Sequence, residues 1–577
     1  MATYSALSFF AGIAVHQAIF IRNDWHLHAP SIVLVHLLLP LCYPLYQAYH
    51  TQDVDFLPLG LQTLGYGSAY LIGLLCSILT YRLFFHRLYK FPGPRLAAVS
   101  KLWHVWKCRH SLGHLVLEEW HQQYGPFVRT GPNELTMFHP GAAELMDNPK
   151  SMRSDWYDLI HPRASAIFTR SKAVHSVRRK IWDRALSQAS LVEYYRRFKH
   201  QIRNLDVCLA DSNGAPIYVN ELMYWYAFDN MGDFGFGADF GMVRDQRWVE
   251  GALMMRSALT LLGPFSPAIW IPRLGFAFVP NLGKVRHWFK MLDFADACTD
   301  ARMKASYPSS NSNHKCENVV NHSTESANPD VSSIFIKEFL AGPQDQHSRR
   351  LLSGDIATMV VAGRYPRSLI TSLTSLHSPY VRLTTTSDTT APSLTILLYH
   401  LARYPEQAAR VRKELSTVAD TADARVLATL PELQAFINES QRLLPAILSF
   451  GSRVTPPEGL TLDGTFIPGG VKIGAPRYSL GRLSDAYVRP HEFIAERWTT
   501  RPDLIKDKRS FSPFATGRMS CVGKNLALAQ LRLVAALVLT KYKLSFVDGN
   551  GELVEDDMKD QLTANPGKLV LQFKPLE

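Results

Sequence analysis

The chain has 577 residues, a formal net charge of +12 and 47% hydrophobic residues. This length suits one large domain or several smaller ones, and the basic excess suits an anionic membrane face or an acidic protein partner. Because the sequence has no long run of Lys and Arg, we expect no nucleic-acid partner. Seven cysteines without regular spacing or a Cys-x-x-Cys pair argue against a disulfide framework and a structural zinc site.

The first predicted elements are three apolar stretches without Asp, Glu, Lys or Arg, at residues 4–21, 30–50 and 56–81. A helix needs about 20 apolar residues to cross the roughly 30 Å of hydrocarbon in a bilayer, so each stretch is a candidate transmembrane helix. The first two contain His16, His36 and prolines, which leaves a re-entrant segment or packing against a neighbour as alternatives. No basic region precedes the first stretch, which argues against a cleaved signal peptide.

Charges around these stretches predict their orientation. The loop before the third stretch is acidic, with Asp53 and Asp55, and the segment after it is basic, with Arg82 and Lys90. The positive-inside rule therefore assigns that loop to the lumen and everything beyond the third stretch to the cytosol. Either one or three crossings from a lumenal N-terminus give this result. We predict a membrane anchor in residues 1–88 with up to three transmembrane helices.

A proline hinge separates this anchor from the rest of the chain. In the segment Lys90-Phe-Pro-Gly-Pro-Arg95, two prolines around a glycine cannot continue a helix. The remainder is predicted to be mostly helical, and an amphipathic helix is expected over residues 403–418. The Gly, Asp-Gly and Pro-Gly-Gly punctuation of residues 459–472 predicts short hairpins. The predicted fold class is mainly α with small β-sheets.

The segment with the clearest chemistry is Phe514-Ala-Thr-Gly-Arg-Met-Ser-Cys521-Val-Gly523, which a helical pattern follows from Asn525. A glycine-bearing loop thus delivers a thiol to a helix N-terminus, where backbone N–H groups and the helix dipole favour the thiolate. A thiolate is a strong axial ligand for haem iron. Glycines let the backbone approach a flat macrocycle, and Phe514 can shield the sulfur. The alternative is a buried, inert cysteine before a helix.

This segment resembles the haem loop of the cytochrome P-450 family, Phe-x-x-Gly-x-Arg-x-Cys-x-Gly. Four positions match the family pattern: Phe514, Gly517, Cys521 and Gly523. The resemblance implies the cytochrome P-450 fold and haem b, with Cys521 as the ligand of the iron. In the family the Arg of this loop contacts a haem propionate, but this chain has Met519 there. Whether Arg518, one place earlier, replaces it stays open.

Two further segments resemble family motifs that have a structural role. Glu439-Ser-Gln-Arg442 is similar to the Glu-x-x-Arg helix, and a spacing of three residues places both side chains on one face as an ion pair. Phe493-Ile-Ala-Glu-Arg497-Trp resembles the Pro-Glu-Arg-Trp segment, with Ala in place of Pro. The resemblance implies that Arg497 joins Glu439 and Arg442 in a buried triad that serves folding and not catalysis.

Another segment, His175-Ser-Val-Arg-Arg179, resembles the helix whose His and Arg bind haem propionates. A spacing of four residues places His175 and Arg179 on one helical face. The alternative is a solvated basic helix, since Arg178 and Lys180 lie between or beside them. By resemblance, Arg453 is a further candidate for propionate binding.

In the family, a long helix over the haem carries Ala/Gly-Gly-x-Asp/Glu-Thr, whose acid and alcohol relay protons during oxygen activation. Here Ala362-Gly363 and Ser387-Asp388-Thr389 are separated by residues 364–386, which contain two prolines. Proline inside a helix costs about 3 kcal/mol or more. Because deletion of 364–386 restores the family pattern, we interpret this segment as a retained intron translated in frame. A genuine loop that splits the helix is the alternative. Asp388 and Thr389 are the candidate catalytic residues.

The resemblance implies a haem-thiolate monooxygenase that activates O2 to hydroxylate or otherwise oxidise an apolar small molecule. Its electrons would come from NADPH through a membrane-bound flavin reductase, the NADPH-cytochrome reductase. The three apolar stretches, the proline hinge and the Val-Gly-Lys-Asn-Leu-Ala ending of the haem loop most resemble fungal microsomal members, many of which serve secondary metabolism. We therefore expect an anchor in the endoplasmic reticulum and a cytosolic catalytic domain at residues 89–577. Two alternatives stay open: a haem-thiolate isomerase or dehydratase, and an inactive membrane protein if residues 364–386 are genuine.

Overall fold

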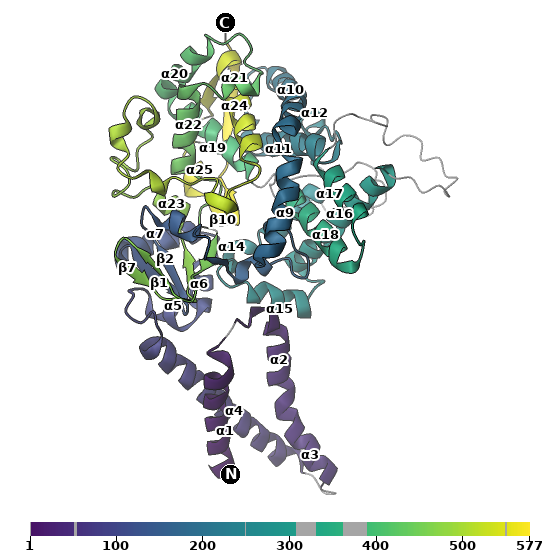
Figure 1. The fold of residues 1–577 in the computed structure, drawn as a ribbon, viewed down its shortest axis with the longest axis vertical. Helices are drawn as coiled ribbons and strands as arrows, with labels where there is room; N and C mark the ends of the chain where they lie inside the picture. The colour runs from purple at the N-terminus through teal and green to yellow at the C-terminus, as the bar shows by residue number, and fades with distance from the viewer. Residues whose placement is uncertain are drawn as a thin grey trace, which may run out of the picture.

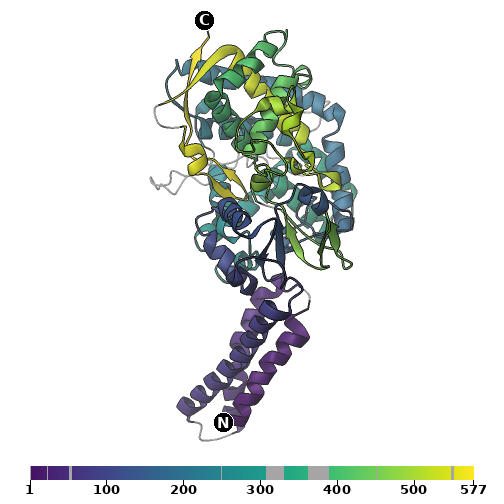
Figure 2. The same ribbon diagram turned by 90° about the vertical axis from the view of Figure 1, so that its left-hand side faces the viewer.

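The computed structural model describes all residues except 1, 23, 51–54, 249, 307–329, 362–388, 450, 548–550 and 577. Within the described residues, a mainly helical body stands on a narrow bundle of apolar helices (Figure 1; Figure 2). The predicted fold class is confirmed, because helices dominate the body and its sheets are small. The predicted insert 364–386 and Asp388 lie outside the described residues.

The apolar bundle contains the three stretches predicted to be helical. Its helices are α1 (Ala2–Val15), α2 (Ala29–Leu38), α3 (Cys42–His50) and α4 (Phe56–Thr80). Among the described residues, three continuous helical segments are long and apolar enough to cross a membrane: Thr3–Phe20, His26–His50 and Phe56–Phe85. These segments agree with the predicted stretches to within a few residues at each end.

Helices α1 and α4 pack closely because a glycine on each helix faces the backbone of the other. A Cβ atom at Gly12 would lie 2.1 Å from a backbone oxygen of α4, and one at Gly73 would lie 2.0 Å from a backbone oxygen of α1. Such small residues let membrane helices approach closely. Polar groups of the first stretch are satisfied in the same contact, since His16 Nδ1 lies 2.8 Å from Ser77 Oγ. The first stretch therefore packs against a neighbour, one of the two alternatives that its sequence left open.

The loop between the first two apolar segments contacts the globular body. His26 bridges two carboxylates, with Nδ1 2.7 Å from Asp24 Oδ1 and Nε2 2.9 Å from Asp158 Oδ2. Arg170 Nη1 of the body lies 2.9 Å from Asp24 Oδ2. Beside this cluster, α15 (Trp270–Phe278) packs against α2 (Figure 1). The loop and the body therefore lie at the same end of the bundle, as three crossings require.

The centre of the globular body is a group of helices buried on most sides. It comprises α11 (Val219–Phe236), α19 (Thr390–Arg403), α22 (Pro431–Leu443) and α24 (Lys524–Lys541), and α19 contacts the other three. Helix α24 is apolar nearly all round, which is the pattern of a helix inside a core. Surrounding helices complete the body: α7 (Gly113–Tyr124), α9 (Lys172–Ala185), α10 (Gln188–Asp211), α13 (Glu250–Leu259), α16 (Gly283–Ser306), α17 (Val331–Ala341), α18 (Gln346–Val361) and α20 (Pro405–Leu415).

The largest sheet has the strand order β1-β2-β8-β5-β3. Its strands are β1 (Phe127–Gly131), β2 (Glu134–Met137), β8 (Lys472–Gly474), β5 (Ser452–Val454) and β3 (Met152–Arg153). The pairing of β3 with β5 is antiparallel and sets Arg153 directly opposite Arg453. This register brings two cationic side chains together at the sheet edge next to the cavity described below.

The smaller sheets are hairpins and a three-stranded unit. Strands β6 (Leu460–Leu462) and β7 (Thr465–Ile467) form the hairpin predicted in residues 459–472, and both turn residues, Asp463 and Gly464, have positive φ. This conformation explains the Asp-Gly pair. The remaining strands are β4 (Ile217–Tyr218), β12 (Val570–Pro575) and β9 (Tyr542–Phe546) in one sheet, and β10 (Lys559–Gln561) with β11 (Thr563–Asn565) in another.

Candidate active site

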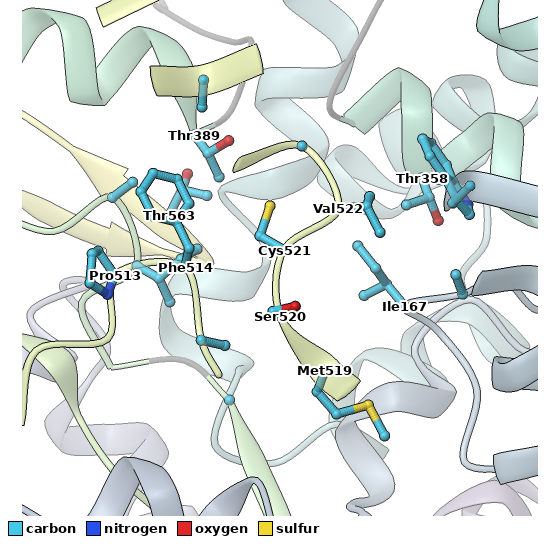
Figure 3. Close-up of a pocket in the computed structure, with 18 of the residues that line it drawn as sticks. Ile167, Thr358, Thr389, Pro513, Phe514, Met519, Ser520, Cys521, Val522 and Thr563 are labelled. Atoms are coloured by element: carbon cyan, nitrogen blue, oxygen red, sulfur yellow. The ribbon is translucent and has the colours of Figure 1, made fainter. Parts of the chain in front are cut away.

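A cavity of about 390 Å³ lies at the centre of the globular body. Its wall is formed by the loop before α24, by α9, by strands β3 and β5, and by the facing ends of α18 and α19. Most of the lining is apolar, with Ile167, Phe168 and Phe234 among its residues. Figure 3 shows the Cys521 thiol in the middle of this lining, with Thr389 and Thr358 on opposite sides of it.

The loop that carries Cys521 is folded back on itself. The backbone N–H of Cys521 donates a hydrogen bond to Phe514 O at 2.8 Å, which closes the loop. Gly517 has a φ of 58°, a left-handed conformation that favours glycine over other residues. A Cβ atom at Gly523 would lie 3.9 Å from Cys521 Sγ, so the glycine keeps the space beside the sulfur open. Cys521 therefore has an exposed side chain that presents its sulfur to the cavity.

Opposing effects act on the ionisation of the Cys521 thiol. Burial raises its pKa above the ordinary value, while the backbone N–H groups of Gly523 and Lys524 and the nearby Arg179 and Arg477 pull the pKa down. These N–H groups belong to the start of α24, so the helix N-terminus acts on the sulfur as the sequence predicts. A metal ion that coordinates the sulfur would remove the remaining proton, because a coordinated thiol is deprotonated.

The three candidates for propionate binding all line the cavity. His175 and Arg179 lie on α9, and Arg453 lies on β5. Burial and the neighbouring cations Arg153, Arg179 and Arg453 together lower the pKa of His175 to about 4, so the imidazole is neutral at physiological pH.

The guanidinium groups of these candidates also support the cavity wall. Arg179 donates to Ser520 O at 2.7 Å, and Arg453 donates to the Tyr157 hydroxyl at 2.5 Å. Arg179 and Arg453 therefore add positive charge to a largely apolar cavity, and all three residues add hydrogen-bond donors.

Helix α9 is not solvated on all sides, contrary to the alternative that its basic sequence left open. Arg178 is buried, and its Nε lies 2.5 Å from Asp355 Oδ2 on α18. Asp355 also accepts hydrogen bonds from Trp182 Nε1 at 2.8 Å and from the backbone N–H of Ala166 at 3.1 Å. This buried carboxylate joins α9 to α18.

The position that departs from the family pattern lies in the cavity wall. Met519 lines the cavity, whereas Arg518 is exposed and is not one of the described lining residues. Two arginines that no motif indicates also line the cavity: Arg153 on β3, and Arg477 at the start of α23 (Arg477–Leu480). Arg153 Nη2 lies 3.2 Å from the Met519 sulfur. Sequence analysis missed Arg153 because its place depends on the register of a two-residue strand.

The candidate proton-relay residues are described only in part. Thr389 lies immediately before α19 and lines the cavity, opposite Thr358 of α18 (Figure 3). Thr358 Oγ1 lies 2.7 Å from Ser165 Oγ and 2.8 Å from Gly354 O. Asp388 lies outside the described residues.

The residues of the expected triad meet in a fully buried cluster. Glu439 Oε1 lies 2.8 Å from Arg442 Nη2 and 2.8 Å from Arg497 Nε, and none of the three side chains is exposed to solvent. Glu439 also accepts hydrogen bonds from Trp498 Nε1 at 2.9 Å and from Ile494 N at 2.8 Å. The cluster links α22 to the segment that precedes the loop of Cys521, and it does not line the cavity.

These features fit a flat, apolar macrocycle with a central iron and two carboxylates. Of the cysteines whose side chains are described, Cys521 alone lines the cavity. The apolar wall suits the macrocycle, and the cations on α9, β3 and β5 suit its carboxylates. One of these cations, Arg153, has a buried Nε with no hydrogen-bond partner among the described residues. The residues present therefore fit a haem.

Comparison with known proteins identifies the family. The family model for cytochrome P-450 matches residues 92–360 and 381–573. The chain belongs to the cytochrome P-450 family. Members hold haem through a thiolate ligand, and this chain is a monooxygenase of the family. The match begins at the predicted proline hinge and breaks over residues 361–380, inside the region of the predicted insert.

Individual P-450 relatives cover nearly the whole chain. The chain is 31% identical over 562 residues to cytochrome P-450 monooxygenase notG′ of Aspergillus versicolor, covering 96% of this chain and 94% of that one. It is 30% identical over 578 residues to tryprostatin B 6-hydroxylase of Aspergillus fumigatus, covering 97% and 94%. The fold resembles the crystal structure of the cytochrome P-450DA haem domain, with a TM-score of 0.61, 16% identity, and 81% of this chain and 94% of that chain covered.

Proposed function

We propose that Cys521 is the thiolate ligand of a haem b and that the enzyme hydroxylates an apolar small molecule of fungal secondary metabolism. The observation that carries this proposal is the placement of one cysteine sulfur at the centre of an apolar cavity, with cationic side chains along its wall. The relative named tryprostatin B 6-hydroxylase supports hydroxylation as the reaction and a secondary metabolite as the substrate class.

Different residues of the cavity would bind the haem and the substrate. When bound, haem supplies the activation of dioxygen and the transfer of one oxygen atom to the substrate. His175, Arg179 and Arg453 would donate hydrogen bonds to the propionates, and the Cys521 sulfur would hold the iron. Ile167 and the other apolar side chains of the wall bind the substrate and exclude water.

Thr389, together with Asp388, carries protons from solvent to the reacting oxygen. The Thr389 side chain lines the cavity, which supports this role, and its position at the start of α19 matches the alcohol of the family motif. Thr389→Ala should leave oxygen consumption in place and lower the fraction of it that yields product. Equal coupling in the variant would remove Thr389 from the relay.

The anchor and the charge suggest the electron source. We propose electron transfer from NADPH through a flavin-containing NADPH-cytochrome reductase in the same membrane. The net charge of +12 suits an acidic partner, and the three apolar segments suit anchoring in the endoplasmic reticulum with the domain 89–577 in the cytosol.

We further propose that residues 364–386 are a retained intron and are absent from the active enzyme. The break of the family match over 361–380 supports this proposal, as does the restoration of the family pattern when Gly363 is joined to Ser387. Sequencing the transcript across this region tests it directly. Presence of the segment in the message of an active enzyme would refute the intron and leave a tolerated loop.

The carbon monoxide difference spectrum of the reduced, full-length protein tests the central proposal. It should be recorded with and without residues 364–386 and for Cys521→Ser, with Cys208→Ser as the matched control because Cys208 does not line the cavity. The thiolate-haem band should survive in the control and disappear in Cys521→Ser. A thiolate band that persists in Cys521→Ser would overturn the assignment. A band in neither length of the chain would favour the inactive membrane protein.

A further inference from the structure

We propose that Arg153 binds a haem propionate in this chain and takes over the contact that the family assigns to the arginine at position 519. This inference rests on the proposed haem site and assigns one more residue to it. The observations that carry it are the position of Arg153, its hydrogen-bond donors and the charges around it.

Arg153 lies beside position 519, where this chain has Met and the family has Arg. Its Nη2 lies 3.2 Å from the sulfur of Met519, so the guanidinium group adjoins the side chain that stands where the family has an arginine. The β3–β5 register sets Arg153 directly opposite Arg453, a propionate candidate on independent grounds. Both arginines are buried to 7% exposure and both line the cavity. Arg518, the rival from the sequence, is exposed and is not among the described lining residues.

The donors of Arg153 are only half used. Nη1 donates to two backbone oxygens, Ala166 O at 2.8 Å and Thr169 O at 3.1 Å, and this fixes the guanidinium plane. Among the described residues, the hydrogen-bond partner of Nη2 is the Met519 thioether, a weak acceptor, and Nε has no partner. Nε and Nη2 form one edge of the guanidinium group, and that edge is the fork that accepts a carboxylate in a bidentate pair. The free edge of Arg153 is therefore shaped for a carboxylate ligand.

The charges around Arg153 also favour the binding of an anion. Like charges directly opposite each other on paired strands are unfavourable, and Arg153 faces Arg453. Burial lowers the pKa of Arg153 to about 10, and Arg453 and Arg179 contribute to the decrease. Among the described lining residues the only carboxylate is Asp147, and it accepts hydrogen bonds from the backbone N–H and hydroxyl of Thr516. Asp147 also pairs with Arg453, whose Nη2 lies 3.7 Å from Asp147 Oδ1, whereas Arg153 has no carboxylate partner among the described residues. A propionate would supply the counter-charge that Arg153 lacks.

Haem retention tests this proposal without reference to turnover. In the full-length detergent-solubilised holoenzyme, Arg153→Leu should release haem to an excess apo-globin acceptor about tenfold faster or more, because a charge-assisted bidentate contact is lost. Arg196→Leu is the matched control, since Arg196 is exposed on α10 and contacts only Glu193 among the described residues. The double variant Arg153→Leu/Met519→Arg should recover slow release, because it restores the family arrangement.

Other results would overturn the proposal. Haem release from Arg153→Leu at the parental rate would overturn it. Fast haem release from Arg518→Leu together with slow release from Arg153→Leu would also overturn it. If Arg153→Leu fails to fold, Arg153→Lys keeps the charge without the fork. It should also release haem faster, and a parental rate would count against a bidentate contact. The parental protein should first show the thiolate-haem band. If it does, a negative result in these variants refutes the role of Arg153 and not the haem assignment itself.

Discussion

Replacing Glu439 with Gln removes one negative charge from between two buried guanidinium groups and nearly preserves the side-chain volume. Oε1 accepts hydrogen bonds from Arg442 Nη2, Arg497 Nε and Ile494 N, each at 2.8 Å. Oε2 accepts from Arg442 Nε and Trp498 Nε1, both at 2.9 Å. A glutamine keeps one of these oxygens and turns an N–H₂ group toward donors at the other position. Two arginines that cannot lose their protons then remain buried without a counter-charge.

The cost follows from this geometry. Breaking a buried ion pair by removing one partner destabilises a protein by about 3–5 kcal/mol. Unfolding entropy scales with length, so a domain of roughly 490 residues loses about 1 °C in melting temperature for each kcal/mol. Glu439→Gln should therefore lower the melting midpoint of the globular body by about 3–5 °C.

Thermal unfolding in detergent, followed by circular dichroism, measures this shift. The matched control is Glu492→Gln, because Glu492 pairs with Arg489 at the surface and both side chains are half exposed. The control should keep the parental midpoint. Equal midpoints for both variants would refute the reasoning. They would mean that the backbone oxygens around Arg442 and Arg497 compensate their charges without Glu439.

Two other perturbations address the membrane bundle and a buried acid. In a Cys76→Ser background, cysteines introduced by His16→Cys and Ser77→Cys should cross-link the first apolar segment to α4. Adding Gly73→Leu should abolish the cross-link, and its persistence would show that the helices tolerate a side chain there. Burial raises the pKa of Asp560 to about 6, above its unfolded value, while Ser449 opposes the rise. The folded state therefore binds more protons between about pH 4 and 6, and stability falls by about 2–3 kcal/mol as pH rises through that window. Asp560→Asn should lose this contribution, so its melting temperature should not show the decrease from pH 4.5 to pH 7 that Asp560 causes in the parent. A decrease equal to that of the parent would refute the assignment.

Features encoded by neighbouring residues were predictable from the sequence. The loop of Cys521 could be predicted from the spacing of its glycines, and the helix after it from the apolar pattern that begins a few residues beyond Cys521. The β6–β7 hairpin follows from Asp463-Gly464, and the contact of Glu439 with Arg442 follows from their helical spacing. In each case the sequence separation is short, so local geometry determines which side chains meet.

Features that depend on distant pairings were not predictable. Arg153 reaches the cavity because β3 pairs with β5, about 300 residues later in the chain, and a two-residue strand has no periodicity to detect. Arg178 has the sequence context of a surface residue, yet it is buried because Asp355 of α18 lies opposite it. The contact of His26 with Asp158 spans 132 residues and joins parts of the chain with different compositions.

The contact between the loop of the apolar bundle and the body has a practical consequence for protein production. Deleting the residues before the proline hinge to obtain a soluble enzyme would leave Asp158 and Arg170 without the His26 and Asp24 that now bridge them. It would also expose the face of α15 that α2 covers. Asp158 and Arg170, 3.4 Å apart, would keep each other as partners but lose two of their polar contacts. A truncated protein would thus expose a new apolar surface on α15 beside a less well satisfied ion pair. Expression of the intact chain in nanodiscs preserves both.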